Sequence, residues 1–258
     1  MLELEAQFSV VTPLFLGGAD PENKEELSIR VPSIKGALRF WYRAIALKRL
    51  GSLGKVREEE AQLFGSTKTG QSLFLTRVED AKLETIKKEK RVSGGTAYLG
   101  YGVVKWNTNA RAPLTTRPHI KPGSSFKLSL RFRPRKDIKQ DYINDLKLAV
   151  KALGLFGGLG ARSRRGLGSL GLMSLKENGQ TIWSAPRTID ELRVKYEEFF
   201  QELNLPDKTE LPEYTAFSRH SRVVIATADR NAERLLNKVG QAMNRYRSYR
   251  GDRNYPRD

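Results

Sequence analysis

Residues 154–171 read GLFGGLGARSRRGLGSLG, a stretch that joins a predicted helix to a predicted strand. Seven of these residues are glycine, and Arg162, Arg164 and Arg165 are arginine. Glycine permits positive φ and a close approach of the backbone to another molecule, while arginine offers a planar charged fork that suits phosphate oxygens. A flexible surface loop would use the same glycines but would not need three arginines within four residues. The stretch therefore predicts a loop that lies against a polyanion.

Hydrophobic periodicity on both sides of this loop predicts alternating strands and helices. Strands are predicted over residues 2–11, 71–79, 98–105, 125–132 and 168–175. Helices are predicted over residues 34–50, with Ser33 as the N-cap, and over residues 56–64 and 139–155. The order strand–helix–strands–helix–strand is that of the split βαβ unit, which the RNA recognition motif shares. The predicted fold class is therefore α+β, with a ferredoxin-like (RRM-like) domain over residues 1–178 that contains the glycine-rich loop 154–171.

The C-terminal part of the chain, residues 179–258, predicts a second ferredoxin-like domain that is degenerate or incomplete. Its patterns predict helices over residues 189–203 and 230–247 and one strand over residues 221–228, too few strands to close a second sheet. The last residues, 241–258, interleave arginine with tyrosine. That composition suits single-stranded RNA, and it suits a solvated disordered tail equally well.

The charge of the chain indicates what class of partner it binds. Lysine and arginine number 46 against 29 acidic residues, a net charge of +17. Nucleic acid is the leading candidate, because a phosphate backbone attracts basic surface without any base reading, and a membrane surface is second. No stretch approaches the roughly 18 apolar residues of a transmembrane helix, and the first residues lack the features of a signal peptide. The sequence predicts a cytoplasmic protein that does not enter a membrane.

The sequence predicts no metal site and no cofactor. It has no cysteine, and its two histidines, His119 and His220, lack the spacing of metal ligands. The glycine-rich loop contains neither GxxxxGK[ST] nor GxGxxG, so it matches neither a P-loop nor a dinucleotide site. His119 lies in TTRPHIKPG (residues 115–123), which predicts a turn-rich hairpin with an exposed histidine.

The helix predicted over residues 34–50 carries a second basic feature. Lys35, Arg39 and Arg43 are spaced i, i+4, i+8 and form one stripe, and Gly36 lies beside the helix N-terminus, where an anion is favoured. A solvated basic face is the alternative interpretation. We expect this helix N-terminus and the glycine loop to face one another across a groove. The predicted RNA-binding residues are Lys35, Gly36, Arg39, Arg43, Gly157, Gly158, Gly160, Arg162, Arg164 and Arg165.

Three segments in this order resemble a known family. FLGGADP (residues 15–21), PSIKGALRFWYRA (32–44) and GLFGGLGARSRRGLGSL (154–170) are similar to the RAMP superfamily of CRISPR-associated proteins, and within it to the first RAMP subunit of the type III-B (Cmr) effector complex. The resemblance covers residues 1–175 well and the remainder weakly. The chain also stops earlier than the family pattern leads us to expect. It implies tandem ferredoxin-like folds, binding to CRISPR RNA and target RNA, contact with other RAMP subunits of the effector complex, and no enzymatic activity.

An enzyme is the alternative class. The resemblance also implies that an acidic residue in the loop before this helix cleaves target RNA in the backbone RAMP subunits, and Asp20 lies in such a loop. One aspartate with a bound Mg²⁺ can assist RNA cleavage. Asp20-Pro21 is also an ordinary turn dipeptide. The predicted function is therefore an RNA-binding, non-catalytic subunit, with a metal-assisted endoribonuclease that uses Asp20 as the alternative.

Overall fold

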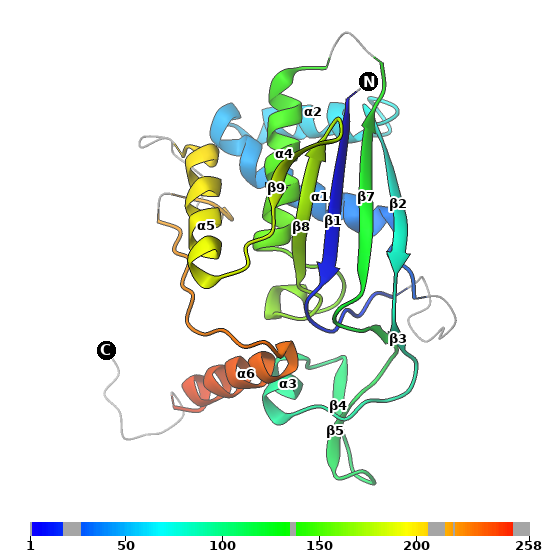
Figure 1. The fold of residues 1–258 in the computed structure, drawn as a ribbon, viewed down its shortest axis with the longest axis vertical. Helices are drawn as coiled ribbons and strands as arrows, with labels where there is room; N and C mark the ends of the chain where they lie inside the picture. The colour runs from blue at the N-terminus through cyan, green and yellow to red at the C-terminus, as the bar shows by residue number, and fades with distance from the viewer. Residues whose placement is uncertain (1, 18–26, 135–137, 206–214, 219, 250–258) are drawn as a thin grey trace.

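The computed structural model describes residues 2–17, 27–134, 138–205, 215–218 and 220–249 (Figure 1). Asp20, on which the endoribonuclease alternative depends, lies outside the described residues, as do Arg250, Arg253 and Tyr255 of the C-terminal segment. No helix in the described parts of the chain is both long and apolar enough to span a bilayer.

A five-stranded antiparallel sheet forms the centre of the molecule. Its order is β2-β7-β1-β8-β9, and the first four of these strands reproduce the spatial order of a ferredoxin-like unit. Strict alternation along β1 buries every second side chain against the helical layer. The strands are β1 (Glu3–Val10), β2 (Phe74–Lys82), β7 (Ser125–Phe132), β8 (Leu170–Glu177) and β9 (Gln180–Ser184). The α+β fold class predicted from the sequence is confirmed.

Helices α1 (Val31–Leu50) and α4 (Gln140–Leu155) pack together and cover one face of this sheet (Figure 1). Hydrophobic periodicity predicts an inward face of α4, and this face is confirmed as buried: Tyr142, Leu146, Ala149, Val150 and Leu153. Helix α2 (Leu53–Phe64) follows α1 closely. Ser33 is not the N-cap: α1 begins at Val31, and Pro32 in its first turn already has the φ that a helix start requires. Ser33 therefore lies inside the helix.

The sequence places Ile34, Leu38, Trp41 and Ile45 on one face of α1, and the buried face differs from this prediction at one residue. Ile34, Leu38 and Ile45 are fully buried as expected, but Tyr42 completes this face, and Trp41 is only half-buried. A spacing of i, i+4, i+8, i+11 keeps Ile34, Leu38, Tyr42 and Ile45 in line on a helix of 3.6 residues per turn. Trp41 is left free to line a surface hollow.

Two predicted strands are wrong. Residues 98–105 divide between helix α3 (Gly94–Leu99) and strand β4 (Val104–Asn107), because Gly102 has a φ of 94° that breaks the extended chain. Strand β4 pairs with β5 (Ala112–Thr115). Residues 221–228 form no strand and pair with no strand in the described part of the chain, so their extended pattern is not completed by backbone hydrogen bonds from a sheet.

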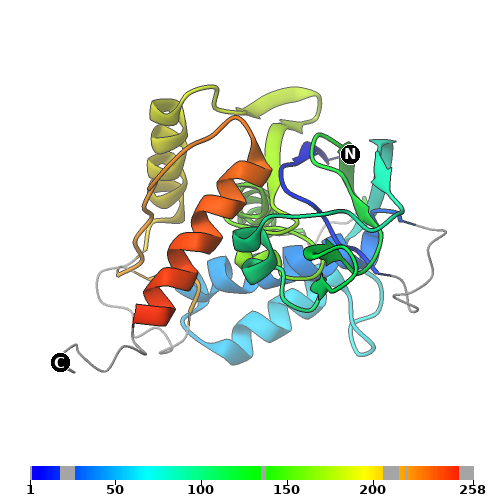
Figure 2. The same ribbon diagram turned by 90° about the horizontal axis from the view of Figure 1, so that it is seen from below.

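The remaining elements lie at the margins of the sheet. The short strands β3 (Thr85–Ile86) and β6 (His119–Ile120) pair with each other, and α5 (Ile189–Leu203) packs on α4. Helix α6 (Ala232–Tyr249) crosses α3 beyond the end of the sheet (Figure 2). Within the described residues after Ser184 there are two helices and no strand. The predicted division of the chain near residue 178 stays a prediction.

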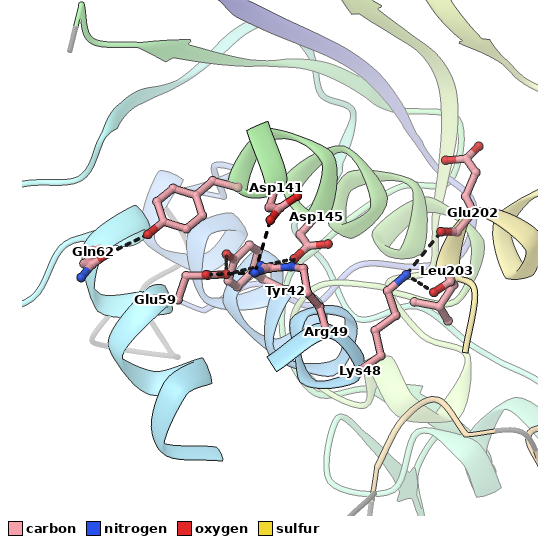
Figure 3. A network of polar contacts seen from close by, with 10 residues as sticks. Tyr42, Lys48, Arg49, Glu59, Gln62, Asp141, Asp145, Glu202 and Leu203 are labelled. Carbon is pink, nitrogen blue, oxygen red and sulfur yellow. Dashed lines mark hydrogen bonds and ion pairs between the residues drawn. The ribbon is translucent and has the colours of Figure 1, made fainter. Parts of the chain in front are cut away.

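An ion-pair network fastens α1 to α2 and α4 (Figure 3). Arg49 of α1 forms ion pairs with Glu59 of α2 and with Asp145 of α4, the latter at 2.7 Å. The Tyr42 hydroxyl donates to Glu59 Oε1 at 2.7 Å. Burial raises the pKa of Asp145, and its hydrogen bond from Arg49 opposes that change. The network fixes the C-terminal half of α1, so the N-terminal half is presented from a rigid base.

Candidate nucleic-acid interface

The N-terminal half of α1 and the glycine-rich loop enclose a hollow of about 780 Å³. Ser33, Ala37 and Trp41 form its wall on the helix side, and residues 157–161 form the facing wall. Three arginines reach it from separate parts of the chain: Arg30 before α1, Arg117 after β5 and Arg164 in the glycine loop. We call this the arginine hollow. None of the described residues that line it is acidic.

Within the described parts of the chain, the three arginines of the arginine hollow have no carboxylate partner. Arg30 donates to the carbonyl of Gly17, and Arg164 lies over the ring of Phe40 at 5.2 Å. The Nε of Arg117 is buried and has no hydrogen-bond partner in the described parts of the chain. Among the described residues, no ion pair joins any of the three to an acidic side chain. Three cations that meet no carboxylate among the described residues create a positive potential at the hollow, which suits a polyanion.

The glycines of the loop are required by the protein's own packing. A Cβ at Gly157 would lie 2.8 Å from Trp41 Nε1, and one at Gly158 would lie 2.6 Å from the carbonyl oxygen of Gly168. Gly160 has a φ of 77°, and its Cβ would collide with the carbonyl of Phe15. These positions therefore need glycine whether or not a ligand approaches them, and their contact with RNA stays a prediction.

The basic stripe of α1 lies on the other side of the helix from the glycine loop. Lys35, Gly36 and Arg39 line a second hollow of about 630 Å³, together with Arg133. We call this the lysine hollow. Burial, and secondly the charge of Arg39, lower the pKa of Lys35. A Cβ at Gly36 would meet nothing within 4 Å, so the helix backbone is open to solvent at that point.

A carboxylate already engages two members of the stripe. Glu60 of α2 pairs with Arg39 at 3.5 Å and with Arg43 at 3.4 Å. The Arg39 guanidinium also donates to the carbonyl of Gly65. Arg43 lines neither the arginine hollow nor the lysine hollow. Lys35 is therefore the one member of the stripe that forms no ion pair with another described residue.

The three arginines of the glycine-rich loop lie at three different places on the molecule. Arg162 has a φ of 61°, and its Nε donates to the carbonyl of Tyr101 at 2.6 Å. Its guanidinium lies over the Tyr101 ring. Arg165 lines a different hollow, between the loop and α6. Arg164 alone of the three lines the arginine hollow. The α1 N-terminus and the glycine loop do face one another across a groove, as expected, but the basic stripe does not line it.

Sequence reasoning missed Arg30 and Arg117. Arg30 directly precedes helix α1, so its position beside PSIKGALRFWYRA could have indicated that it belongs to the binding site at the helix N-terminus. Arg117 carries no local signal, because its partners in the hollow lie far away along the chain. His119, expected to be exposed, is instead 1% exposed. Its strand β6 pairs with β3, and its ring packs on Phe15.

Comparisons with known proteins identify the family. The sequence profile of the RAMP superfamily matches residues 7–171, a range that includes both α1 and the whole glycine loop. The chain belongs to the RAMP superfamily. The resemblance inferred from residues 15–21, 32–44 and 154–170 is thereby confirmed. Among the described residues of this RAMP protein, no group of three or more histidine, cysteine, aspartate or glutamate side chains could hold a metal ion.

Two relatives and two solved structures are similar to this RAMP protein. The CRISPR system Cmr subunit Cmr1-2 of Pyrococcus furiosus is 30% identical over 192 residues, which are 69% of this chain and 98% of that protein. Subunit Cmr1-1 of the same organism is 33% identical over 57% of this chain and 41% of its own length.

The two structures support the fold. The crystal structure of Cmr1 from Pyrococcus furiosus has a TM-score of 0.63 at 24% identity and covers all of this chain and 78% of that one. A type III-B Cmr-beta structure bound to cognate target RNA contains a chain with a TM-score of 0.53 at 15% identity, over 78% of this chain and 62% of that chain. Identities this low carry an argument about fold alone.

Proposed function

We propose that this chain is an RNA-binding, non-catalytic subunit of a type III-B CRISPR effector complex, acting in the cytoplasm with other RAMP subunits on CRISPR RNA and target RNA. The arginine hollow is the observation that carries the proposal, because its described lining gathers three arginines and includes no acidic residue. The relatives add support, since both are named as subunits of the CRISPR Cmr system.

In the proposed binding mode, the RNA backbone crosses the N-terminal half of α1. Arg30, Arg117 and Arg164 contact phosphates on the side of the arginine hollow, and Lys35 contacts them on the side of the lysine hollow. The free N–H groups and dipole of the helix N-terminus add a further preference for anions. Gly36 allows the RNA backbone to lie close to the helix.

This mode favours phosphate contacts over base reading. Trp41 is half-buried and packs against Phe156 and Phe217, and Phe40 is covered by the guanidinium of Arg164. Neither ring is therefore presented as an open stacking platform. Phosphate contacts position an RNA without reading its sequence, so we expect weak sequence preference and strong dependence on salt.

The test replaces Arg30, Arg117 and Arg164 together by alanine and measures affinity for single-stranded RNA. We expect a large loss, because three charge-assisted contacts disappear together. Arg39→Ala with Arg43→Ala should cost less, because Glu60 already holds both arginines. Arg193→Ala is the control, since Arg193 is exposed on α5 and lines neither hollow. A triple variant that keeps its thermal stability and binds like the parent would refute the proposal.

A separate experiment tests the absence of catalysis. The purified chain with Mg²⁺ or Mn²⁺ is expected to leave RNA intact over hours. Slow cleavage that is lost in Asp20→Ala but kept in Asp80→Ala would assign catalysis to Asp20 and establish the endoribonuclease alternative.

A further inference from the structure

Tyr101 is the most exposed aromatic residue in the described part of the chain. It lies in the turn between α3 and β4, and 76% of its surface is accessible to solvent. Phe40 and Trp41, which line the arginine hollow, are only half-buried but already contact other side chains. A single exposed tyrosine is ordinary on a protein surface. What distinguishes Tyr101 is the way in which its ring is held.

Arg162 of the glycine-rich loop holds the Tyr101 ring from one side. Its guanidinium carbon lies 5.8 Å from the ring centroid, within the range of a cation–π contact, and its Nε donates to the carbonyl of the same tyrosine. Gly102 leaves room for this guanidinium, because a Cβ there would lie 3.4 Å from Arg162 Nη2. One face of the ring is thus covered by a cation. Since most of the Tyr101 surface remains accessible, the opposite face is open to solvent.

The held ring lies beside the arginine hollow. Ala161, Ser163 and Arg164 line that hollow, whereas Arg162 does not. Arg162 has a φ of 61°, which a residue with a side chain rarely adopts, and its side chain lies on Tyr101 instead. The Cα atoms of Arg162 and Arg164 are at most about 7 Å apart, because only two residues of chain join them. A single strand of RNA can therefore contact the hollow and the ring together.

We propose that the open face of Tyr101 stacks on one base of the single-stranded RNA whose phosphates lie in the arginine hollow. Stacking on an aromatic ring tolerates any sequence, because every base has a π-face. The ring is held in place before RNA arrives, which reduces the entropy that binding costs. The inference rests on the proposed function and adds a base contact to its phosphate contacts.

The test compares Tyr101→Leu with Tyr101→Phe in the whole chain. Both variants keep the backbone carbonyl that accepts from Arg162, but only phenylalanine keeps a π-face. We expect Tyr101→Leu to bind an oligouridine of about ten nucleotides roughly tenfold more weakly than the parent. Tyr101→Phe should bind like the parent. The slope of log K against log salt should not change in Tyr101→Leu, because no phosphate contact is lost.

An abasic strand of the same length isolates the contribution of the bases. It keeps every phosphate of the oligouridine but has no base at any position, so a shift of register cannot restore a stacking contact. The parent should bind this strand about tenfold more weakly than oligouridine. Tyr101→Leu should bind the two strands with similar affinity. This comparison uses the parent chain as well, so it remains decisive if a variant fails to fold.

Trp106→Leu is the matched control. Trp106 is also exposed, at 67%, but it lies on β4 in the β4–β5 hairpin, which extends away from the sheet (Figure 1). We expect this variant to bind oligouridine like the parent. Equal losses in Tyr101→Leu and Trp106→Leu would overturn the inference, because any exposed aromatic side chain would then contribute.

The remaining outcomes separate this inference from the proposed function. If Tyr101→Leu with unchanged melting temperature binds oligouridine like the parent, the ring does not stack on RNA, and a protein partner is left as the candidate for this surface. If the parent binds RNA with the expected salt dependence but does not prefer oligouridine to the abasic strand, only the stacking inference is wrong. If the parent binds neither strand, the proposed function is wrong as well.

Discussion

Glycine serves two different purposes on the two sides of helix α1. In the loop, Gly157, Gly158 and Gly160 let the backbone pack against other parts of this chain at distances that no Cβ permits. Gly36, on the lysine hollow, has open space where its side chain would be. The loop glycines are explained by folding alone. Gly36 has no such explanation, since glycine inside a helix is destabilising.

Replacing Gly36 by alanine separates binding from stability. We expect Gly36→Ala to raise the free energy of unfolding by about 0.5–1 kcal/mol, because alanine loses less backbone entropy in a helix. We expect RNA affinity to fall severalfold, because the new methyl group projects into the proposed path of the RNA. Urea unfolding and an RNA titration measure the two effects. A more stable variant with unchanged affinity would show that RNA does not approach the helix there.

Replacing Gly160 by alanine tests the packing role of the loop. We expect the free energy of unfolding to fall by about 3 kcal/mol or more, because a left-handed φ of 77° and a collision with the Phe15 carbonyl act together. Gly179→Ala is the matched control: its φ is 83°, but nothing lies within 4 Å of the added Cβ. The control should lose about 1 kcal/mol. Equal losses in the two variants, measured by urea unfolding, would contradict the proposed collision.

At the level of elements, helix α1 combines a fixed end and an open end. Its C-terminal half is fastened by Arg49 to α2 and α4, and Lys48 donates to the Leu203 carbonyl at the end of α5 (Figure 3). Its N-terminal half lies between the arginine hollow and the lysine hollow. This arrangement holds the proposed binding groups in place before RNA arrives, which reduces the entropy that binding would otherwise cost.

Arg49→Met tests the network. We expect the free energy of unfolding to fall by about 2–3 kcal/mol at pH 7. This is below the usual range for breaking a buried ion pair, because the Arg49 side chain is 25% exposed. Burial already raises the pKa of Asp145, and the variant lacks the hydrogen bond that lowers it, so the pKa should rise further.

The sign of the pH dependence follows from that change. A carboxyl whose pKa is raised in the folded state lowers the free energy of unfolding as the pH increases. This loss develops between the carboxyl's ordinary pKa of about 3.9 and its raised pKa in the folded protein. The difference between Arg49→Met and the parent should therefore shrink at about pH 4.5. Urea unfolding at pH 7 and about pH 4.5 measures the difference in the free energy of unfolding between the parent and Arg49→Met. If this difference grew on acidification, this account of Asp145 would be excluded.

At the scale of the whole molecule, the net charge of +17 is larger than the charge of the few basic side chains that form the proposed interface. Many basic side chains elsewhere are paired, as Lys151 is with Glu202 and Lys147 with Glu177. The arginine hollow differs because its cations converge and lack carboxylate partners in the described chain. Position rather than total charge should therefore determine the salt dependence of RNA binding.

Single charge removals test this expectation. Arg117→Ala should lower the slope of log K against log salt by about 0.7, the contribution of one phosphate contact on a single strand. Arg193→Ala changes the net charge equally and should leave the slope unchanged. If the two variants have the same slope across a salt series, binding depends on net charge and the arginine hollow has no special role.

The sequence by itself determined the elements that have a strong period and clear ends. Strand β1, helices α1 and α4 and strand β8 were predicted in the correct order, and the ferredoxin-like arrangement follows from that order. Periodicity reports which face of a segment is buried, and that information is local. The family was also accessible from the sequence, since PSIKGALRFWYRA and the glycine loop are contiguous motifs.

Only the tertiary structure decided which charged groups meet. The packing of separate segments brings Arg117 and Arg164 to one hollow, and Glu60 of α2 forms ion pairs with Arg39 and Arg43. No local sequence pattern encodes either arrangement. The burial of His119 depends in the same way on its packing against Phe15. Residues 221–228 have a strand-like pattern but pair with no strand in the described chain, and a strand forms only where a partner satisfies its backbone hydrogen bonds.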